Sequence, residues 1–163
     1  MLGGAAVIGA FSMLGVSCTN KMKKRIDFLE SFWYDVILLK TKISERCLLA
    51  RSLKYVGMFS RYGFFWNDWA GFAENHGIMA ACEKTIEKNR SKCFMKDSDI
   101  KNIRLLANVL GKTDIDAQLE HIDYISSALE YSCNAAVKEY EKNSGLYRNG
   151  CILLGIFTFI LLA

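Results

Sequence analysis

The residues that could support catalysis are few in this chain and stand far apart. There are two histidines, His76 and His121, and the six cysteines show neither a CxxC pair nor another short metal-binding spacing. His76 falls in an expected turn and His121 on an expected helix, where a surface or hydrogen-bonded histidine is the ordinary interpretation. The chain also lacks a Gly-rich phosphate loop and an HExxH motif. We therefore name no catalytic residue, no metal ligand and no cofactor-binding residue.

The carboxylates offer no pair for acid–base chemistry. Asp and Glu are scattered along expected helices, mostly with a lysine nearby, as on solvated helix faces. A catalytic site needs groups that converge, and none can be identified. We expect a protein that is not an enzyme and that has no cofactor.

An aromatic run is better suited to contact with another protein. Between residues 64 and 72, three rings at helical spacing fit a core stripe: Phe65, Trp69 and Phe72. Phe64 and Trp66 would then point elsewhere and are candidates for a docking surface, because aromatic side chains anchor interfaces. The alternative is ordinary core packing with one ring partly exposed.

A charged group on the next expected helix extends this candidate surface. Glu83, Lys84, Glu87 and Lys88 follow one another at short spacing beside the aromatic helix. They could meet a partner, or they could form a solvated helix face, which is the usual role of exposed charges.

The distribution of charge divides the chain into three parts. All 21 Lys and Arg and all 17 Asp and Glu lie between Lys21 and Arg148, so residues 1–20 and 149–163 carry none. A charge in the bilayer core costs about 2.5–3.5 kcal/mol on insertion scales. The pattern predicts an N-terminal transmembrane helix at 1–20, a cytoplasmic helical domain at 21–148 and a short C-terminal transmembrane helix at 149–163.

The first apolar run would be a helix of roughly 25 Å, against a bilayer core of ~30 Å. A cleaved signal peptide carries its positive charge before the apolar region, whereas here it follows, at the four membrane-interface residues Lys21, Lys23, Lys24 and Arg25. The positive-inside rule then places residues 21–148 in the cytoplasm and the N-terminus outside. Cys18 raises the alternative of a lipoprotein, against which the reversed charge argues.

The second apolar run, 150–163, would give only about 22 Å of helix. Tyr147 and Arg148 stand at its inner edge, where an aromatic ring and a cation are typical of a membrane interface. A short spanning helix in contact with membrane lipid is the favoured interpretation, and a buried helix of a soluble domain is the alternative. The net charge of +4 is modest and does not suggest nucleic-acid binding.

The region between the ends is expected to be all-α, a bundle of about six helices. Proline is absent and no strand-like alternation of useful length occurs. Apolar spacing predicts helices at about 22–43, 47–59, 64–74, 78–92, 97–110 and from 113 onward. The expected boundary residues are Gly77 after the third helix, Asp97 or Ser98 before the fifth, and Thr113 or Asp114 before the last.

The last helix carries a heptad-like seam with one polar interruption, at Ser126. Its apolar members are Ile115, Leu119, Ile122, Leu129, Cys133, Ala136 and Tyr140. On the first helix, the expected inner face is Ile26, Leu29, Trp33, Val36, Ile37 and Ile43. We expect the first and last helices to be long antiparallel partners that continue into the terminal membrane helices.

Two stretches resemble a known family. Leu110-Gly111-Lys112-Thr113-Asp114, followed by Gln118-Leu119 and Ile122, is similar to the "LG..D...QL..I" segment of the stage III sporulation protein AB family. The ending, Tyr147-Arg148 then Gly150 and a Leu/Ile-rich tail with Gly155, is similar too. The likeness is strongest over residues 105–163, and Ser44–Leu48 departs from the family's Thr-Pro-Leu turn.

The resemblance implies a specific role. The family acts in the mother cell of endospore-forming bacteria, in the channel complex that links mother cell and forespore, and its helical domain is similar to type II secretion platform domains (GspF-like). It implies a mother-cell membrane location, at the forespore outer membrane. The partners it implies are the stage III sporulation protein AA ATPase and other proteins of the same operon. The alternative is a generic twice-anchored scaffold with no motor partner, which could be a homo-oligomer.

Overall fold

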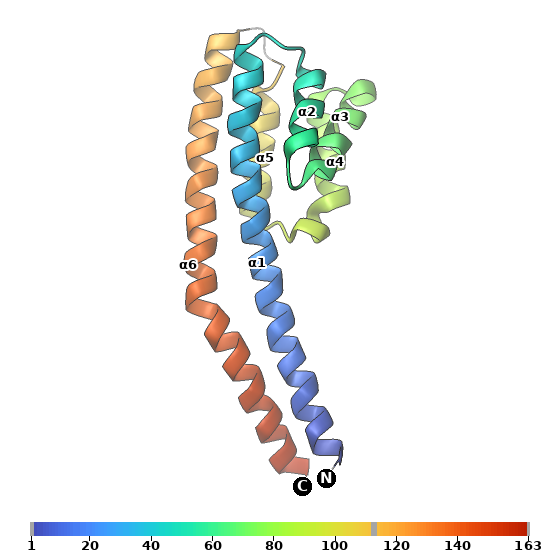
Figure 1. Cartoon of the computed structure of the whole chain (residues 1–163), viewed down its shortest axis with the longest axis vertical. Coiled ribbons are helices and arrows are strands. Elements are labelled where there is room, and N and C mark those ends of the chain that lie inside the picture. Colours follow the sequence, from blue (N-terminus) through green and yellow to red (C-terminus); the bar gives the residue numbers. More distant parts are fainter. Residues whose placement is uncertain (1, 112–113, 163) are drawn as a thin grey trace. The chain divides into compact units, whose positions relative to one another are not determined.

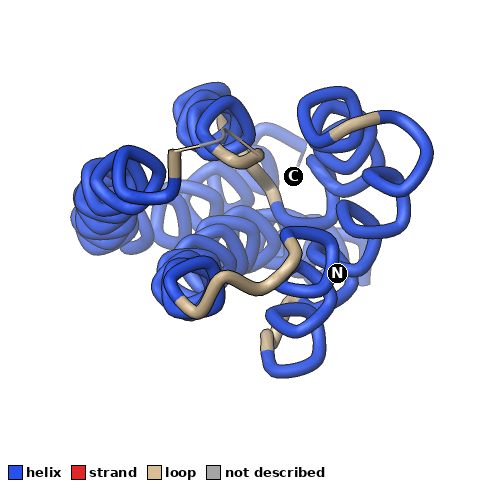
Figure 2. The backbone as a smooth tube through the Cα atoms, turned by 90° about the horizontal axis from the view of Figure 1, so that it is seen from above, coloured by secondary structure: helices blue, strands red, loops and turns tan. Residues whose placement is uncertain are grey.

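The structure, a computed structural model, describes the backbone of residues 2–111 and 114–162. In that part of the chain it is entirely helical between short connections, without a strand (Figure 2). In chain order the helices are α1 (Leu2–Ser44), α2 (Leu49–Phe59), α3 (Gly63–His76), α4 (Ile78–Cys93), α5 (Asp97–Val109) and α6 (Ile115–Leu162) (Figure 1). The all-α prediction is confirmed, with its order of six helices.

The residues divide into two units. The central unit is Asp27–Asn134, and the terminal unit is Met1–Ile26 together with Ala135–Ala163.

The core of the central unit is a cluster of rings from α1 and α3. Phe32 stacks on Trp66 with centroids 4.9 Å apart, and Trp66 stacks on Trp69 at 5.6 Å. Phe28 and Phe65 meet edge to face at 5.6 Å. All five rings are fully buried or nearly so. Aromatic pairs contribute about 0.5–1.5 kcal/mol beyond the area they bury, so this cluster fixes how α3 packs on α1.

The inner face of α1 differs in part from the prediction. Leu29, Val36 and Ile43 are buried as expected, but Ile37 is 42% exposed, so its placement in the core was wrong. The remaining core positions of this helix are Phe28, Phe32 and Leu39. The buried positions step by three and four residues from 29 through 32, 36, 39 and 43, and that stripe leaves position 37 outside.

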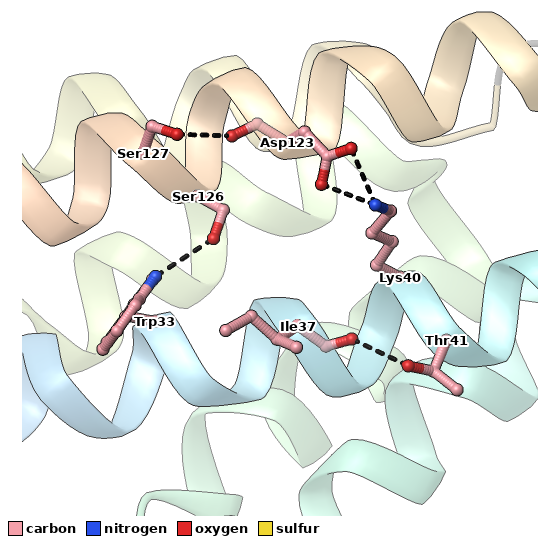
Figure 3. Close-up of polar contacts among 7 residues, drawn as sticks. All are labelled: Trp33, Ile37, Lys40, Thr41, Asp123, Ser126 and Ser127. Atoms are coloured by element: carbon pink, nitrogen blue, oxygen red, sulfur yellow. Dashed lines mark hydrogen bonds and ion pairs between the residues drawn. The ribbon is translucent and has the colours of Figure 1, made fainter.

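In the central unit, α1 and α6 run antiparallel and are joined by polar contacts. The Trp33 indole N–H donates to the Ser126 hydroxyl at 3.0 Å, and the Lys40 ammonium lies 2.6 and 2.7 Å from the two Asp123 carboxylate oxygens (Figure 3). Ser126 interrupts the apolar seam because it is the acceptor for a partly buried indole. The predicted pairing of the first and last helices is confirmed here.

A tight backbone crossing joins α2 to α3. A Cβ atom on Gly63 would collide with the carbonyl oxygen of Gly57, and one on Gly57 would collide with the Asn67 side chain. Only glycine at both positions permits this approach. The crossing lets the chain reverse over the three residues that separate the helices, and it brings the start of α3 against the end of α2.

The helix boundaries agree with the sequence at two of three places. Asp114 caps α6, because its Oδ1 accepts from the Asp116 N–H at 3.1 Å, while Thr113 lies outside the described residues. Gly77 follows α3 with φ +73°. The cap of α5 was wrong: the helix begins at Asp97, and Asp99 Oδ2 accepts from the Lys96 N–H at 2.9 Å. The first-turn carboxylate thus reaches back to the residue that precedes the helix.

In the terminal unit, the Arg25 guanidinium lies 3.3 Å from the Glu139 carboxylate. Gly15 and Gly155 are buried, whereas Met13, Leu14, Leu153 and several neighbouring apolar side chains are exposed. Within the described residues, no helix combines the length and the apolarity that crossing a membrane requires.

Candidate partner-binding surface

The two aromatic candidates lie in different environments. Phe64 is exposed at the start of α3, where the Lys92 ammonium is 5.9 Å from its ring centroid. Trp66 is fully buried, so the expectation that it points away from the core was wrong. Its indole N–H donates to Asp35 Oδ2 at 2.7 Å. Of the pair, only Phe64 offers surface to a partner.

The reason for the burial of Trp66 is a wide inner face on α3. The buried positions are 65, 66, 69 and 70, whereas Phe72 is only half-buried. An indole can be buried at position 66 because an acceptor for its N–H comes from α1, 31 residues earlier in the chain. Nothing near Trp66 in the sequence signals that acceptor.

Glu83 and Glu87 line a common hollow between α4 and α5. Its volume is about 350 Å³, and its other lining residues are Ile86, Arg90, Asp97, Ile100 and Arg104. The Arg104 guanidinium binds both Glu83 oxygens, at 2.7 and 2.8 Å, and these hydrogen bonds hold the pKa of Glu83 below its usual value. The two glutamates, four residues apart, project from one face of the helix.

Lys84 and Lys88 are not part of that hollow. Lys88 turns toward α3, where its ammonium lies 2.7 Å from Asp68 Oδ1, and the Asn89 amide donates to Asp68 Oδ2 at 2.9 Å. Burial acts to raise the pKa of Asp68, but these two hydrogen bonds and the nearby charges of Lys88 and Lys92 together outweigh it, and the pKa is lowered. Lys84 is exposed. The four predicted charges therefore divide between two sides of α4.

The predicted membrane-interface residues differ in their exposure to solvent. Lys21, Lys23 and Lys24 are exposed, and Tyr147 is 46% exposed. Arg25 is buried against Glu139, so it does not extend the exposed basic cluster. The side chain of Arg148 lies outside the described residues.

The histidines and thiols form no cluster in the described part of the chain. His76 and His121 are both exposed, and among the residues that the structure describes no group of three or more His, Cys, Asp or Glu side chains could hold a metal ion. Burial raises the pKa of the Cys82 and Cys93 thiols to about 12. Both are therefore protonated at neutral pH, and a thiol is a poorer nucleophile than a thiolate.

A buried carboxylate on α1 was missed by the sequence reasoning. Asp35 is only 6% exposed, and its Oδ2 accepts from the Ser60 hydroxyl at 2.6 Å as well as from Trp66. Burial raises the pKa of Asp35, and the two hydrogen bonds offset this only in part. The signal that could have identified it is a lone acidic residue inside the otherwise apolar and aromatic stretch 32–39.

A second hollow opens beside this carboxylate. It has a volume of about 270 Å³ and lies between α1 and the connection from α2 to α3. The lining residues are Asp27, Glu30, Ser31, Tyr34, Asp35, Phe59 and Arg61. This charged hollow shares no lining residue with the one between α4 and α5.

Comparison with known proteins gives one assignment. No curated protein matches the chain, and no solved structure does. The sequence profile of stage III sporulation protein AB matches residues 1–163, including the two stretches near 110–122 and 147–155. Because that profile covers all 163 residues, this chain belongs to the stage III sporulation protein AB family.

Proposed function

We propose that the chain is a non-enzymatic platform subunit of the sporulation channel between mother cell and forespore, docking a cytosolic secretion-type ATPase. The observation that carries the proposal is the family match over the whole chain. The partner would be the stage III sporulation protein AA ATPase, together with proteins of the same operon. The helical domain would be related to GspF-like platforms and would present a rigid surface to the motor.

Membrane attachment is the first part of this proposal. Its support is the absence of charge from residues 1–20 and 149–163, with the exposed Lys21, Lys23 and Lys24 next to the first of them. A dense group of exposed apolar side chains at the ends of α1 and α6 needs cover from lipid or protein. We infer short terminal membrane helices, with the N-terminus outside and residues 21–148 in the cytoplasm.

Docking through α4 is the second part. Glu87 is exposed and lines the α4–α5 hollow, where the bidentate Glu83–Arg104 pair links the two helices. Phe64, on α3, is an exposed ring in reach of Lys92. A fixed charged hollow and a separate exposed ring provide a surface that a partner can recognise without reordering it.

The direct test is binding between the purified full-length chain, in detergent, and the ATPase. We expect a saturable complex, weakened by Glu87→Lys and left unchanged by Glu120→Lys, which makes the same charge reversal at an exposed position of α6. Absence of a complex with the unmodified chain would refute the platform function.

A cellular test addresses the role in sporulation. Deletion of the gene should stop development after engulfment and remove heat-resistant spores, and the intact gene should restore them. A gene lacking residues 149–163 should not restore them. Normal spore counts in the deletion strain would contradict the proposal.

A scaffold that acts through self-association is the second candidate function. It is favoured by Tyr124 and Tyr131, which lie seven residues apart on α6 and are 71% and 77% exposed. Tyrosines on one helix face suit a helix–helix interface. Crosslinking in sporulating cells would separate the candidates, since contacts only between copies favour the scaffold and contacts with the ATPase favour the platform.

A further inference from the structure

The hollow beside Asp35 has an unusual charge balance. Three carboxylates line it, from Asp27, Glu30 and Asp35, and Arg61 is its one cationic lining residue. The Arg61 guanidinium is 3.9 Å from Asp27 and largely exposed, so this ion pair is long and solvated. No Lys or Arg occurs in the sequence from 26 to 39. The hollow therefore holds an excess of negative charge on a chain whose net charge is positive.

Only one oxygen of the buried Asp35 carboxylate accepts hydrogen bonds from the described residues. Both hydrogen bonds to Asp35 end on Oδ2, and Oδ1 accepts none from the described residues. The side chain lines the hollow although the residue is more than nine-tenths buried. Among the described residues, Asp35 Oδ1 is not one of the buried atoms that lack a partner, so solvent reaches it. A donor that enters the hollow could therefore take the place of water at this oxygen.

The walls of the hollow are aromatic. Tyr34 and Phe59 line it and are 57% and 67% exposed. Tyr34 packs against Trp33 with centroids 4.9 Å apart, and Phe59 packs against Tyr55 at 4.8 Å, so neighbouring rings support both. A cation held near ring faces and carboxylates gains from both kinds of contact.

We propose that this hollow binds an arginine side chain presented by a partner protein. A metal ion is disfavoured, because the carboxylates do not converge into a metal-binding group within the described residues. A guanidinium is planar, carries five N–H donors and stacks on rings, so it can span separated carboxylates where a compact ammonium cannot. The volume, about 270 Å³, is below the ~300–1,000 Å³ of small-molecule pockets and suits one side chain.

The proposal deepens the platform function, since it names the chemistry that a partner presents. The site lies on α1 and is separate from the α4–α5 hollow. A partner could therefore contact two places on the central unit. Each contact is tested by its own variants.

The test is a titration of the ¹⁵N-labelled full-length chain in micelles with a capped Ala-Arg-Ala peptide, followed through the indole N–H resonance of Trp66. The indole N–H of Trp66 donates a hydrogen bond to Asp35 Oδ2, so its resonance should shift when a guanidinium reaches the same carboxylate. We expect a saturable shift, about fivefold weaker binding with Ala-Lys-Ala, and no shift with the uncharged citrulline peptide.

Three variants sharpen the result. Glu30→Gln should weaken binding about fivefold, and Glu130→Gln, the same charge change at an exposed position of α6, should leave it unchanged. Arg61→Ala should strengthen binding, because it removes the internal competitor; this gain cannot be mistaken for unfolding.

The proposal would be overturned by the absence of a saturable shift, by equal binding of the citrulline peptide, or by unchanged binding in Glu30→Gln. A shift that grows with protein concentration without peptide would assign the arginine to a second copy of the chain and overturn the choice of another protein. The titration contains no ATPase, so its failure is distinct from failure of the platform function.

Discussion

Asp35 shows how a single side chain can tie two helices and a turn to one another. Its Oδ2 accepts from Ser60, in the connection after α2, and from Trp66 on α3, while the residue itself belongs to α1. A carboxylate in this place is desolvated, which is why its pKa is raised. The hydrogen bonds of Asp35 therefore stabilise the fold, whereas the desolvation of its charge destabilises it.

Substitution at Asp35 should separate these two effects. Asp35→Ala leaves the buried Trp66 N–H without an acceptor and should lower the free energy of unfolding by ~2 kcal/mol. Asp35→Asn keeps an acceptor oxygen without the charge and should be far less harmful. Urea unfolding of the full-length chain in detergent, followed by tryptophan fluorescence, measures both. Equal losses in the two variants would show that the charge itself is required.

Asp68 predicts a dependence of stability on pH. Its folded-state pKa is lowered from the usual 3.8, so its stabilising contribution is present above that value and is lost as the pH falls through the folded pKa. The gap in urea midpoint between the unmodified chain and Asp68→Asn should therefore be wide at neutral pH and close below about pH 3.8. A gap that persists at lower pH would show that the Asp68 charge is not responsible.

Single residues were predictable where the signal is local. Asp114 could be assigned as a cap because its partner N–H groups follow it directly. The burial of Trp66 could not, because it depends on an acceptor 31 residues away. The sequence also did not show that Lys88 and Glu87 face different sides of α4, because Lys88 pairs with Asp68 on α3.

At the scale of elements, the crossing of α2 and α3 is the most constrained connection. Gly63→Ala would force the two backbones apart at Gly57 and should cost about 2 kcal/mol or more of stability. Gly71→Ala is the matched control, because α3 is continuous there and no atom lies within 4 Å of the added Cβ. That change should stabilise the protein by ~0.5–1 kcal/mol. Thermal unfolding of both variants checks the contrast, and similar effects would mean that the crossing can relax.

The helices themselves followed from the sequence because composition and period agree. Apolar spacing located all six, and the boundaries of α3 and α4 differ from the expected ones by no more than two residues at either end. The inner face of α1 was less certain because residues 32–39 are apolar or aromatic at nearly every position. Period alone cannot select a face from such a run, and packing against α3 does so.

At the scale of the whole molecule, the proposed membrane attachment rests on the absence of charge from residues 1–20 and 149–163. Leu153 and Phe157 are exposed on the last turns of α6. Replacing both with lysine should release the protein from the membrane fraction of cells, because each charge in a bilayer costs about 2.5–3.5 kcal/mol. Met58→Lys alters an even more exposed apolar residue of the central unit and should not affect fractionation. Continued sedimentation of the double variant with membranes would contradict attachment through α6.

The family could be suspected from the sequence because ordered short motifs carry the resemblance. The surfaces that would meet partners were not, since both hollows combine residues from separate helices: 83–90 with 97–104 in one, and 27–35 with 59–61 in the other. Helical period places residues on one helix face, but it does not say which faces meet.

The stacked indoles of Trp66 and Trp69, with centroids 5.6 Å apart and planes inclined by 16°, also have a spectroscopic consequence. Two chromophores so close and so fixed should be coupled, giving near-ultraviolet circular dichroism that depends on their mutual orientation. Fixed side-chain packing is what such a signal reports, and it vanishes when a core loosens while helices persist. The near-ultraviolet circular dichroism of this tryptophan pair should therefore report whether the core is ordered, without an added label.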